Sequence, residues 1–306
     1  MLTHATHDPL SLGAYRIHTA REGFSSILHV TSGEIMHSRV SPMEEAHGLY
    51  SGQAHLAERL AHGDLHRELV VWDVGLGAAA NAISALEIYE QLAATGRPIR
   101  PLHLISFEND LDSLRLALRH PARFPYLQHP APAAILAHGE WRSDRFPGLS
   151  WKLLPGNFPD TIVQADRPPE VIYYDMYSAK TCATPWRPET FARLRAAGEE
   201  MDRGRGVELF TYTVSTAARL AMLSAGFHVA RGRCMGGKEE TTIAFTVPAL
   251  AEGFASRHEL LGAEWLAKWQ RSAARFPAWL PETDRATFTR TILDHPQFRA
   301  LPTPSV

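Results

Sequence analysis

Short apolar runs alternate with longer amphipathic segments through most of the chain. The runs that predict buried strands lie at residues 69–73, 102–107, 151–154, 171–174 and 207–212. The segments that predict helices lie at residues 78–91, 111–118, 188–201 and 216–225. Strands that alternate with helices indicate a doubly wound α/β domain, in which helices cover both faces of a mostly parallel sheet.

The last two predicted strands break this alternation. Residues 227–233 and 240–245 are joined across Gly236-Gly237, a pair that is typical of hairpin turns. These strands are therefore expected to be antiparallel and to complete a seven-stranded sheet. Such a closing hairpin is usual in Rossmann-like methyltransferases and unusual in nicotinamide-binding domains.

Both ends of the chain add smaller elements. Residues 14–35 alternate apolar and polar side chains and predict a small hairpin. A helix is expected from Ser41, which serves as N-cap while Glu44 completes a capping box. Residues 260–275 and 282–294 predict a helical tail that packs on the domain. The expected divisions are an N-terminal hairpin region (1–36), a Rossmann-like domain (37–247) and a helical C-terminal extension (248–306).

Composition narrows the class of protein. The chain has 306 residues, of which 45% are hydrophobic, and its formal net charge is -2. A nucleic-acid partner would therefore have to meet a local basic patch. Two cysteines indicate a reducing compartment, and neither a signal peptide nor the ~20 apolar residues of a membrane span is recognisable. We expect a cytoplasmic protein, and no metal site because its histidines are scattered.

A glycine turn follows the first strand of the domain. The segment Asp73-Val74-Gly75-Leu76-Gly77 leads into the first helix, and small residues there let backbone N–H groups approach a ligand. Gly75-x-Gly77-x-x-Ala80 fits the dinucleotide fingerprint, and Asp73-x-Gly75-x-Gly77 fits the methyltransferase version equally well. A turn that only joins strand to helix is the third interpretation.

Two carboxylates favour the methyltransferase. Asp73 suits the methionine ammonium group of S-adenosylmethionine and would repel a pyrophosphate. Glu108 ends the second strand, where an acid accepts the ribose hydroxyls of a nucleoside. It follows the glycines by more than the ~20 residues expected of a nicotinamide-binding fold. S-Adenosylmethionine is the predicted cofactor, and a helix N-cap is the alternative role for Glu108.

Two further strand ends are expected at the same crevice, because ligands bind at the carboxyl ends of parallel strands. Gly156 and Asn157 follow the third strand, where adenine is expected to lie. Asp175 follows the fourth strand and is the candidate catalytic residue, which accepts a proton from an attacking amine or orients it. A solvated strand end is the alternative for Asp175.

Several motifs occur in an order and spacing shared with one family. They are GEIMHS (33–38), EEA (44–46), the Asp73 glycine loop, ISFE (105–108), the Gly156 turn, YDMYSAK (174–180), PW (185–186), PETF (188–191), FTYT (210–213), AGF (225–227) and GGKE (236–239). Over roughly residues 20–245 the chain resembles the methyltransferase domain of the bifunctional tRNA 5-methylaminomethyl-2-thiouridine biosynthesis protein and its stand-alone relatives.

The resemblance implies methyl transfer to the aminomethyl nitrogen of a modified wobble uridine in tRNA, without the family's oxidase domain. The further residues that it places at the cofactor are His37, Ser38 and Glu45. The residues expected at the substrate are Tyr177, Trp186, Lys180 and Lys238. Of these, Tyr177 and Trp186 are candidates to stack on a flat base. Ordinary packing is the alternative for Trp186.

Three residues depart from the family pattern. Ala79 stands where the family usually has a third glycine, Asn157 where it often has an acid, and Met176 where it has a glycine. These departures keep other functions open. The alternatives are a methyltransferase that acts on another small amine, a cofactor-binding protein without turnover, and a nicotinamide-dependent oxidoreductase.

Overall fold

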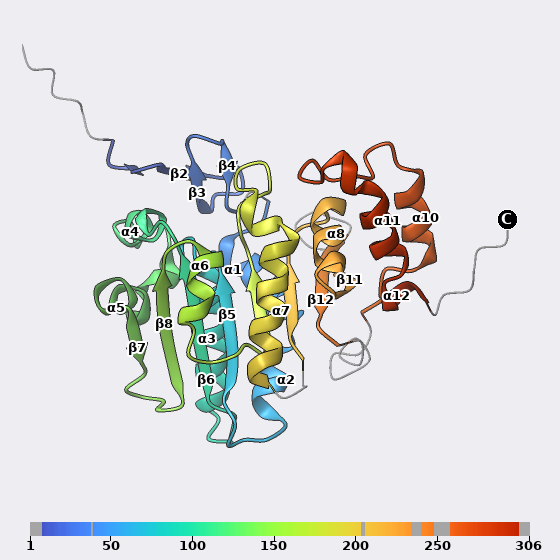
Figure 1. Ribbon diagram of the computed structural model, residues 1–306. Coiled ribbons are helices and arrows are strands. Elements are labelled where there is room, and N and C mark those ends of the chain that lie inside the picture. Colours follow the sequence, from blue (N-terminus) through green and yellow to red (C-terminus); the bar gives the residue numbers. More distant parts are fainter. Residues whose placement is uncertain (1–7, 38, 203–205, 234–239, 248–257, 300–306) are drawn as a thin grey trace, which may run out of the picture.

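The computed structural model describes residues 8–37, 39–202, 206–233, 240–247 and 258–299 (Figure 1). An eight-stranded sheet runs through the centre, in the order β11-β12-β10-β9-β5-β6-β8-β7. Its strands are β5 (Leu69–Val74), β6 (Leu102–Glu108), β7 (Glu140–Arg142), β8 (Leu149–Pro155), β9 (Val171–Tyr174), β10 (Glu208–Thr211), β11 (His228–Gly232) and β12 (Thr241–Phe245).

The five strands β10, β9, β5, β6 and β8 are mutually parallel, and β12 is antiparallel to both of its neighbours. This arrangement confirms the predicted fold class, with its mostly parallel sheet and antiparallel final pair. Every residue of β5 is buried, since apolar helices cover both of its faces. The Gly236-Gly237 connection lies outside the described residues.

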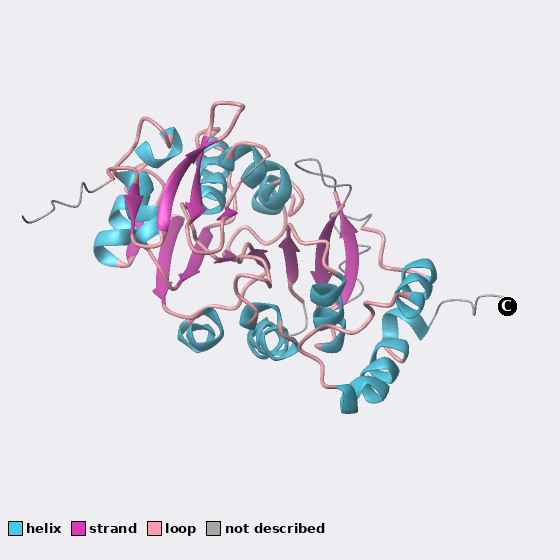
Figure 2. Cartoon of the chain, turned by 90° about the horizontal axis from the view of Figure 1, so that it is seen from above, coloured by secondary structure: helices cyan, strands magenta, loops and turns pink. Residues whose placement is uncertain are grey.

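Helices cover both faces of the sheet (Figure 2). One core cluster lies under α2 (Leu56–Ala61), α3 (Ala80–Ala93), α4 (Asp112–Leu118) and α5 (Pro130–His138). The other lies under α6 (Phe158–Thr161), α7 (Pro188–Asp202) and α8 (Thr216–Ser224). This two-sided covering leaves the carboxyl ends of the strands as the edge on which loops gather.

The sequence pattern missed the outermost strand. β7 has only three residues, pairs antiparallel with β8, and lies in a proline- and alanine-rich stretch without strand periodicity. That stretch also holds η2 (Pro125–Gln128) and α5, which begins at Pro130 with the His129 side chain accepting from the Ala131 N–H group. The sheet therefore has eight strands where seven were expected.

The N-terminal region is larger than the expected hairpin. It forms a four-stranded antiparallel sheet of β1 (Ser11–Leu12), β2 (Tyr15–Thr19), β3 (Ser25–His29) and β4 (Glu34–Ile35). The His120 ring bonds to the Pro9 carbonyl oxygen, and the Arg123 guanidinium donates to the Thr19 hydroxyl. These contacts hold the small sheet beside α4, at the carboxyl edge of the large sheet (Figure 1).

The segment after this small sheet begins as the predicted α-helix and then continues with the wider hydrogen bonding of a π-helix. The Ser41 hydroxyl accepts from the Glu44 N–H group at the start of α1 (Pro42–Glu45), which confirms the predicted cap. The chain continues as a π-helical turn, η1 (Ala46–Ser51). This turn buries Leu49 and Tyr50 against α3 and β10.

The C-terminal helices pack on the edge strand β11 and on α8. They are α10 (Ala263–Arg271), η5 (Glu282–Asp284), α11 (Arg285–Leu293) and α12 (Pro296–Arg299). The Gln297 side chain accepts from the Val229 N–H group and donates to the Val229 carbonyl oxygen, at 2.7 and 2.8 Å. It thereby satisfies backbone groups on the edge strand β11, which would otherwise be open to pairing. None of the described helices meets the length and hydropathy needed to cross a membrane.

Candidate active site

A cavity of about 470 Å³ opens at the carboxyl edge of the large sheet. Its walls include residues 33–37 with Arg39, the glycine turn after β5, the end of β6 at Glu108, and residues 175–177 after β9. The volume lies in the range of small-molecule sites. The candidate residues that the structure brings to this cavity are His37, Glu45, Gly75, Gly77, Glu108, Asp175 and Tyr177.

The glycine turn adopts backbone angles that favour glycine. Gly75 has a φ of +91°, and a Cβ atom on it would lie 2.6 Å from the Asp175 carbonyl oxygen. Gly77 has a φ of +53°, and its N–H group donates to Glu108 Oε2 at 3.0 Å. The turn is therefore a close approach of backbone to two neighbouring strand ends, in addition to a connection between strand and helix.

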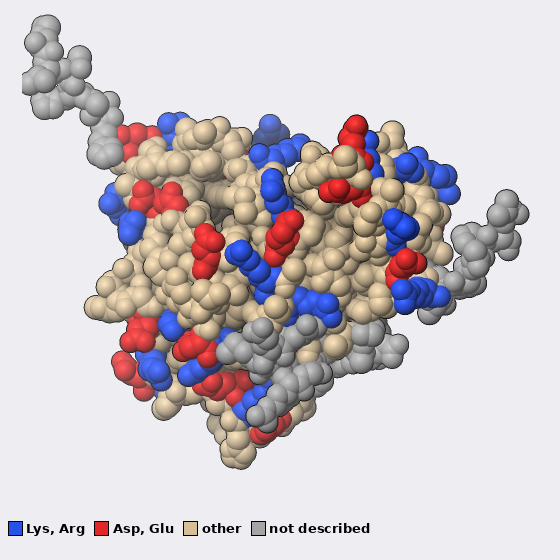
Figure 3. Space-filling view, viewed as in Figure 1, with Lys and Arg blue, Asp and Glu red and all other residues tan. Residues whose placement is uncertain are grey.

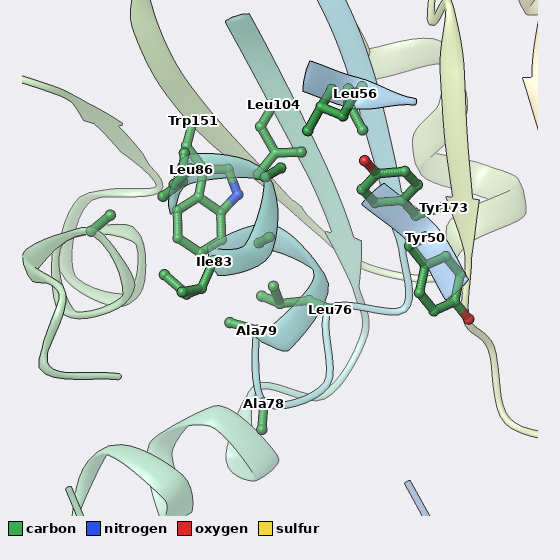
Figure 4. Packing of buried hydrophobic residues seen from close by; sticks show 14 of the residues in the cluster. Tyr50, Leu56, Leu76, Ala78, Ala79, Ile83, Leu86, Leu104, Trp151 and Tyr173 are labelled. Carbon is green, nitrogen blue, oxygen red and sulfur yellow. The ribbon is translucent and has the colours of Figure 1, made fainter. Parts of the chain in front are cut away.

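Ala79 occupies the left-handed region as well, with φ 66° and ψ 19°. It is fully buried, and Figure 4 shows it with Leu76 and Ala78 in the turn that leads into α3. A side chain in this conformation costs free energy that glycine avoids. The departure at this position therefore leaves the loop geometry in place and adds backbone strain.

Glu108 links the glycine turn to the residues that follow β6. Its carboxylate accepts the N–H groups of Gly77, Asn109 and Asp110, at 3.0, 2.8 and 3.0 Å. Burial raises the pKa of Glu108 above its ordinary value, while these backbone hydrogen bonds work in the opposite direction. The carboxylate is thus fixed by backbone groups at the cavity surface.

A second cavity of about 220 Å³ adjoins the first. The residues that line both are Glu108, Asn109, Met176 and Cys182. Gly156 and Asn157 line the smaller one, together with the ring of Phe158, and Asn157 accepts a hydrogen bond from the Asn109 side chain at 3.3 Å. Glu108 consequently stands at the junction of two connected spaces, as a group that holds a ribose between adenine and methionine would.

On the far side of the larger cavity, Asp175 lies within a set of polar groups. The Asn81 side-chain amide donates to Asp175 Oδ2 at 2.9 Å. His37 Nδ1 lies 3.1 Å from Glu45 Oε2. Burial alone would lower the pKa of His37, but its hydrogen bond to Glu45 and the charges of Glu45 and Asp175 raise that pKa overall. The two carboxylates therefore favour the protonated form of His37.

Burial is the largest cause of a raised pKa at Asp175, and the charge of Glu45 adds to it. The His37 charge and the hydrogen bond from Asn81 act in the opposite direction. A carboxylate with a raised pKa is a better proton acceptor than an ordinary one. The site can therefore receive a proton from a bound amine.

Asp73 lies beneath the turn and is not among the described residues that line either cavity. It is fully buried, and its Oδ2 accepts the Ser106 hydroxyl at 2.7 Å, while its Oδ1 has no hydrogen-bond partner in the described part of the chain. Burial raises the pKa of Asp73 to about 8, with smaller contributions from the charges of Asp175 and Glu108. Direct contact with a ligand ammonium group, as expected from the sequence, is not supported by this position.

The expected substrate residues separate into different environments. Tyr177 lines the larger cavity, with its ring 5.3 Å from that of His29. Trp186 is 3% exposed and donates from Nε1 to the Tyr177 carbonyl oxygen, so it packs in the core and presents no free face for a base. Lys180 is exposed in the loop after β9. Ser38 and Lys238 lie outside the described residues.

Several cavity residues were not singled out from the sequence. The sequence pattern does not distinguish Asn81 from other polar residues of a predicted helix. It places Glu34 in the predicted hairpin. Glu34 accepts from the Ser178 N–H group, the Ser178 hydroxyl and the Thr181 hydroxyl, at 2.9, 3.0 and 2.6 Å. A signal was present only for Glu34, which belongs to the GEIMHS motif.

Comparisons with known proteins agree with this geometry. A family model described as "S-adenosyl-L-methionine-dependent methyltransferase" matches residues 138–246, a range that includes Gly156, Asn157 and Asp175. The tRNA 5-methylaminomethyl-2-thiouridine biosynthesis bifunctional protein MnmC of Pseudomonas putida is 26% identical over 204 residues, which are 65% of this chain and 30% of that protein. MnmC of Caulobacter vibrioides is 25% identical over 218 residues, which are 68% of this chain and 34% of that protein.

The chain thus spans about a third of the length of the curated relatives that it matches. Among solved structures, the crystal structure of MNMC2 from Aquifex aeolicus aligns with a TM-score of 0.63 and 18% identity, and the alignment covers 92% of this chain and 85% of that one. That likeness concerns the fold. From the family match, the curated relatives and the cavity geometry, we conclude that this chain is an S-adenosylmethionine-dependent methyltransferase related to MnmC.

Proposed function

We propose that the protein methylates the aminomethyl nitrogen of a modified wobble uridine in tRNA. The observation that carries this proposal is the position of Asp175, which lines the same cavity as Glu108 and the glycine turn but lies in a cluster with His37, Glu45 and Asn81. The relatives are named for the biosynthesis of tRNA 5-methylaminomethyl-2-thiouridine, a nucleoside that carries a methylated amine. An acidic group beside the cofactor space suits an amine acceptor.

The residues present fit S-adenosylmethionine. In the proposed pose, Glu108 accepts the ribose hydroxyls, the cavity at Gly156 and Asn157 holds the adenine, and the backbone at Gly75 and Gly77 faces the methionine part. When bound, the cofactor supplies a methyl group on a sulfonium, which needs no covalent help from the enzyme. The protein's task is to hold the amine in line and to exclude water.

Asp175 performs the proton chemistry in this proposal. An ammonium group has no lone pair to attack with, so the acceptor must lose a proton before methyl transfer. The Asp175 carboxylate receives that proton or holds the neutral amine by a hydrogen bond. His37 lies in a hydrogen bond with Glu45 beside Asp175, and the two carboxylates favour its protonated form.

Tyr177 is the residue that we propose for recognition of the base. Its ring lines the cavity and packs against His29 at the side of the N-terminal sheet. An aromatic ring beside the reacting centre can stack on an unpaired base, as single-stranded RNA recognition generally requires. Trp186 supports Tyr177 from below through its bond to the Tyr177 carbonyl oxygen.

A second acceptor class is favoured by the overall charge. The formal net charge is -2, and acidic and basic side chains are interspersed on the face shown in Figure 3. A protein that binds a large nucleic acid usually carries an excess of basic residues. Methylation of another small amine is the alternative that the net charge supports.

A strain that lacks the gene separates the two acceptor classes. Mass spectrometry of its tRNA nucleosides is expected to show loss of the methylaminomethyl uridine and accumulation of its unmethylated amine. Complementation with the parent gene restores the methylated nucleoside, and complementation with the Asp175→Asn variant does not. An unchanged nucleoside profile in the deletion strain would contradict the tRNA assignment and favour the small amine.

A further inference from the structure

One residue of α3 contacts Asp175, the residue that carries the proposed proton transfer. Asn81 lies in the first turn of that helix, and its amide nitrogen donates to the Asp175 carboxylate. We propose that Asn81 is a positioning residue, which holds the Asp175 carboxylate in the orientation that receives the methyl acceptor. The inference rests on the proposed function of Asp175.

Asn81 is a costly residue for the stability of the fold at its position. It is 4% exposed, and its amide nitrogen donates to Asp175 Oδ2 at 2.9 Å. Its Oδ1 atom is buried without a hydrogen-bond partner among the described residues. A buried amide oxygen left unpaired destabilises a fold measurably, and an apolar side chain would avoid that effect. Packing alone therefore does not account for an asparagine here.

The chemistry of the pair fixes how Asn81 is oriented. An ionised carboxylate only accepts hydrogen bonds, so the amide nitrogen must face Asp175 and the amide oxygen must face away. The turn at Ala79, in the left-handed conformation, directs the chain into α3 two residues earlier. The Ala79 turn therefore sets the position of Asn81 from which its amide nitrogen donates to Asp175.

Tyr50 lies near Asp175 but makes no hydrogen bond to it in the described part of the chain. Its ring is fully buried and lies 5.5 Å from that of Tyr173. Figure 4 shows the two rings side by side with their hydroxyl groups pointing in opposite directions. The Tyr173 hydroxyl donates to the Ser51 hydroxyl at 3.3 Å, whereas the Tyr50 hydroxyl is buried with no partner among the described residues. Asn81 is therefore the residue whose hydrogen bond to Asp175 the structure records.

The charges around Asp175 make this donor matter. His37 and Glu45 from the N-terminal segment lie near the carboxylate, as do three further titratable groups, Asp73, Tyr50 and Tyr212. Glu45 disfavours the ionised form of Asp175, whereas His37 and the Asn81 amide favour it. Without Asn81, the carboxylate loses a fixed partner and its pKa rises further.

The direct test is a titration of Asp175 that needs no methyl acceptor. Carbon-13 NMR of protein labelled at aspartate carboxyl groups, assigned with Asp175→Asn, gives the pKa of Asp175 in the parent, in Asn81→Leu and in Asn81→Ala. We expect a higher pKa of Asp175 in both variants. Ser84→Ala, which removes a buried hydroxyl from the same helix, is the matched control and should leave that pKa unchanged.

Activity provides the second measurement. The acidic limb of kcat/KM against pH should move upward in Asn81→Leu by the same amount as the pKa of Asp175, and kcat should fall about 10-fold or more. If Asn81→Leu fails to fold, Asn81→Ala removes the same donor with a smaller side chain and tests the same claim. An Asp175 pKa that the folded variants leave unchanged overturns the inference. A shifted pKa in a protein whose parent methylates no amine overturns the proposed function instead and leaves the hydrogen-bond geometry standing.

Discussion

Glu34 and Ser178 lie 144 residues apart in the sequence, yet the Glu34 carboxylate accepts both the N–H group and the hydroxyl of Ser178. Glu34 belongs to β4 of the N-terminal sheet, and Ser178 follows Asp175 by three residues. The contact joins the small sheet to the loop that leaves the strand carrying the proposed catalytic residue. The N-terminal sheet is thus part of the wall of the site.

Removal of this contact should loosen the loop. Glu34→Ala leaves the Ser178 and Thr181 donors without their acceptor, and hydrogen bonds to a charged group contribute about 1.5–3 kcal/mol each. We expect faster hydrogen exchange at residues 176–183 and weaker cofactor binding. Glu44→Ala changes an exposed glutamate on α1 and serves as the control. Equal hydrogen exchange at residues 176–183 in Glu34→Ala and in the parent would show that the order of this loop does not depend on Glu34.

Glu108→Ala should weaken binding of S-adenosylmethionine by roughly 1–3 kcal/mol, the loss expected when hydrogen bonds to a charged group are removed. Calorimetry measures this directly. The same carboxylate also accepts three backbone N–H groups, so a lower melting temperature is expected as well. A variant that melts earlier but binds the cofactor as tightly as the parent would assign Glu108 to the backbone alone.

Ala79→Gly should stabilise the protein by up to about 1 kcal/mol, because glycine adopts the left-handed conformation of this residue without steric cost. Urea unfolding gives the free energy. Ala82→Gly, inside α3 and equally buried, is the matched control and should destabilise by about 1 kcal/mol or more. Loss of stability in Ala79→Gly would mean that the methyl group's packing outweighs the backbone strain.

The stability of the protein should depend on pH through Asp73. Its pKa is about 8 in the folded protein and 3.8 in an ordinary environment, so the folded state binds the extra proton between these values. The free energy of unfolding attributable to Asp73 is therefore full below about pH 4 and falls as pH rises toward 8. Asp73→Asn should lack this slope and gain stability over the parent at pH 8 in urea unfolding. An unchanged slope would assign the pH dependence to other groups.

The sequence predicts those residues of the candidate site that lie at the ends of strands. Gly75, Glu108, Gly156 and Asp175 all follow parallel strands, whose carboxyl ends meet at one edge, so their convergence is predictable from the order of elements. Asn81 is different, because its contact depends on the direction in which the Ala79 turn launches α3. That direction has no signature in hydrophobic periodicity.

Burial was the other property that the sequence did not reveal. Asp73 and Trp186 were expected to meet ligands, but the fold places one beneath the glycine turn and the other under Tyr177. Both residues lie next to cavity residues. Their position along the chain therefore did not show whether they contact a ligand or pack behind the residues that do. The edge strand β7 was missed for a related reason, since three residues are too few to show alternation.

We propose that this protein transfers a methyl group from S-adenosylmethionine to an amine under the control of Asp175. The decisive experiment uses cofactor with a deuterated methyl group and tRNA that carries the unmethylated aminomethyl uridine, followed by mass spectrometry of the nucleosides. The parent is predicted to label that uridine with one methyl group. Asp175→Asn is predicted to do so about 10²-fold more slowly or worse, while binding the cofactor normally. No label on the uridine with the parent enzyme, or equal rates for parent and variant, would contradict the account.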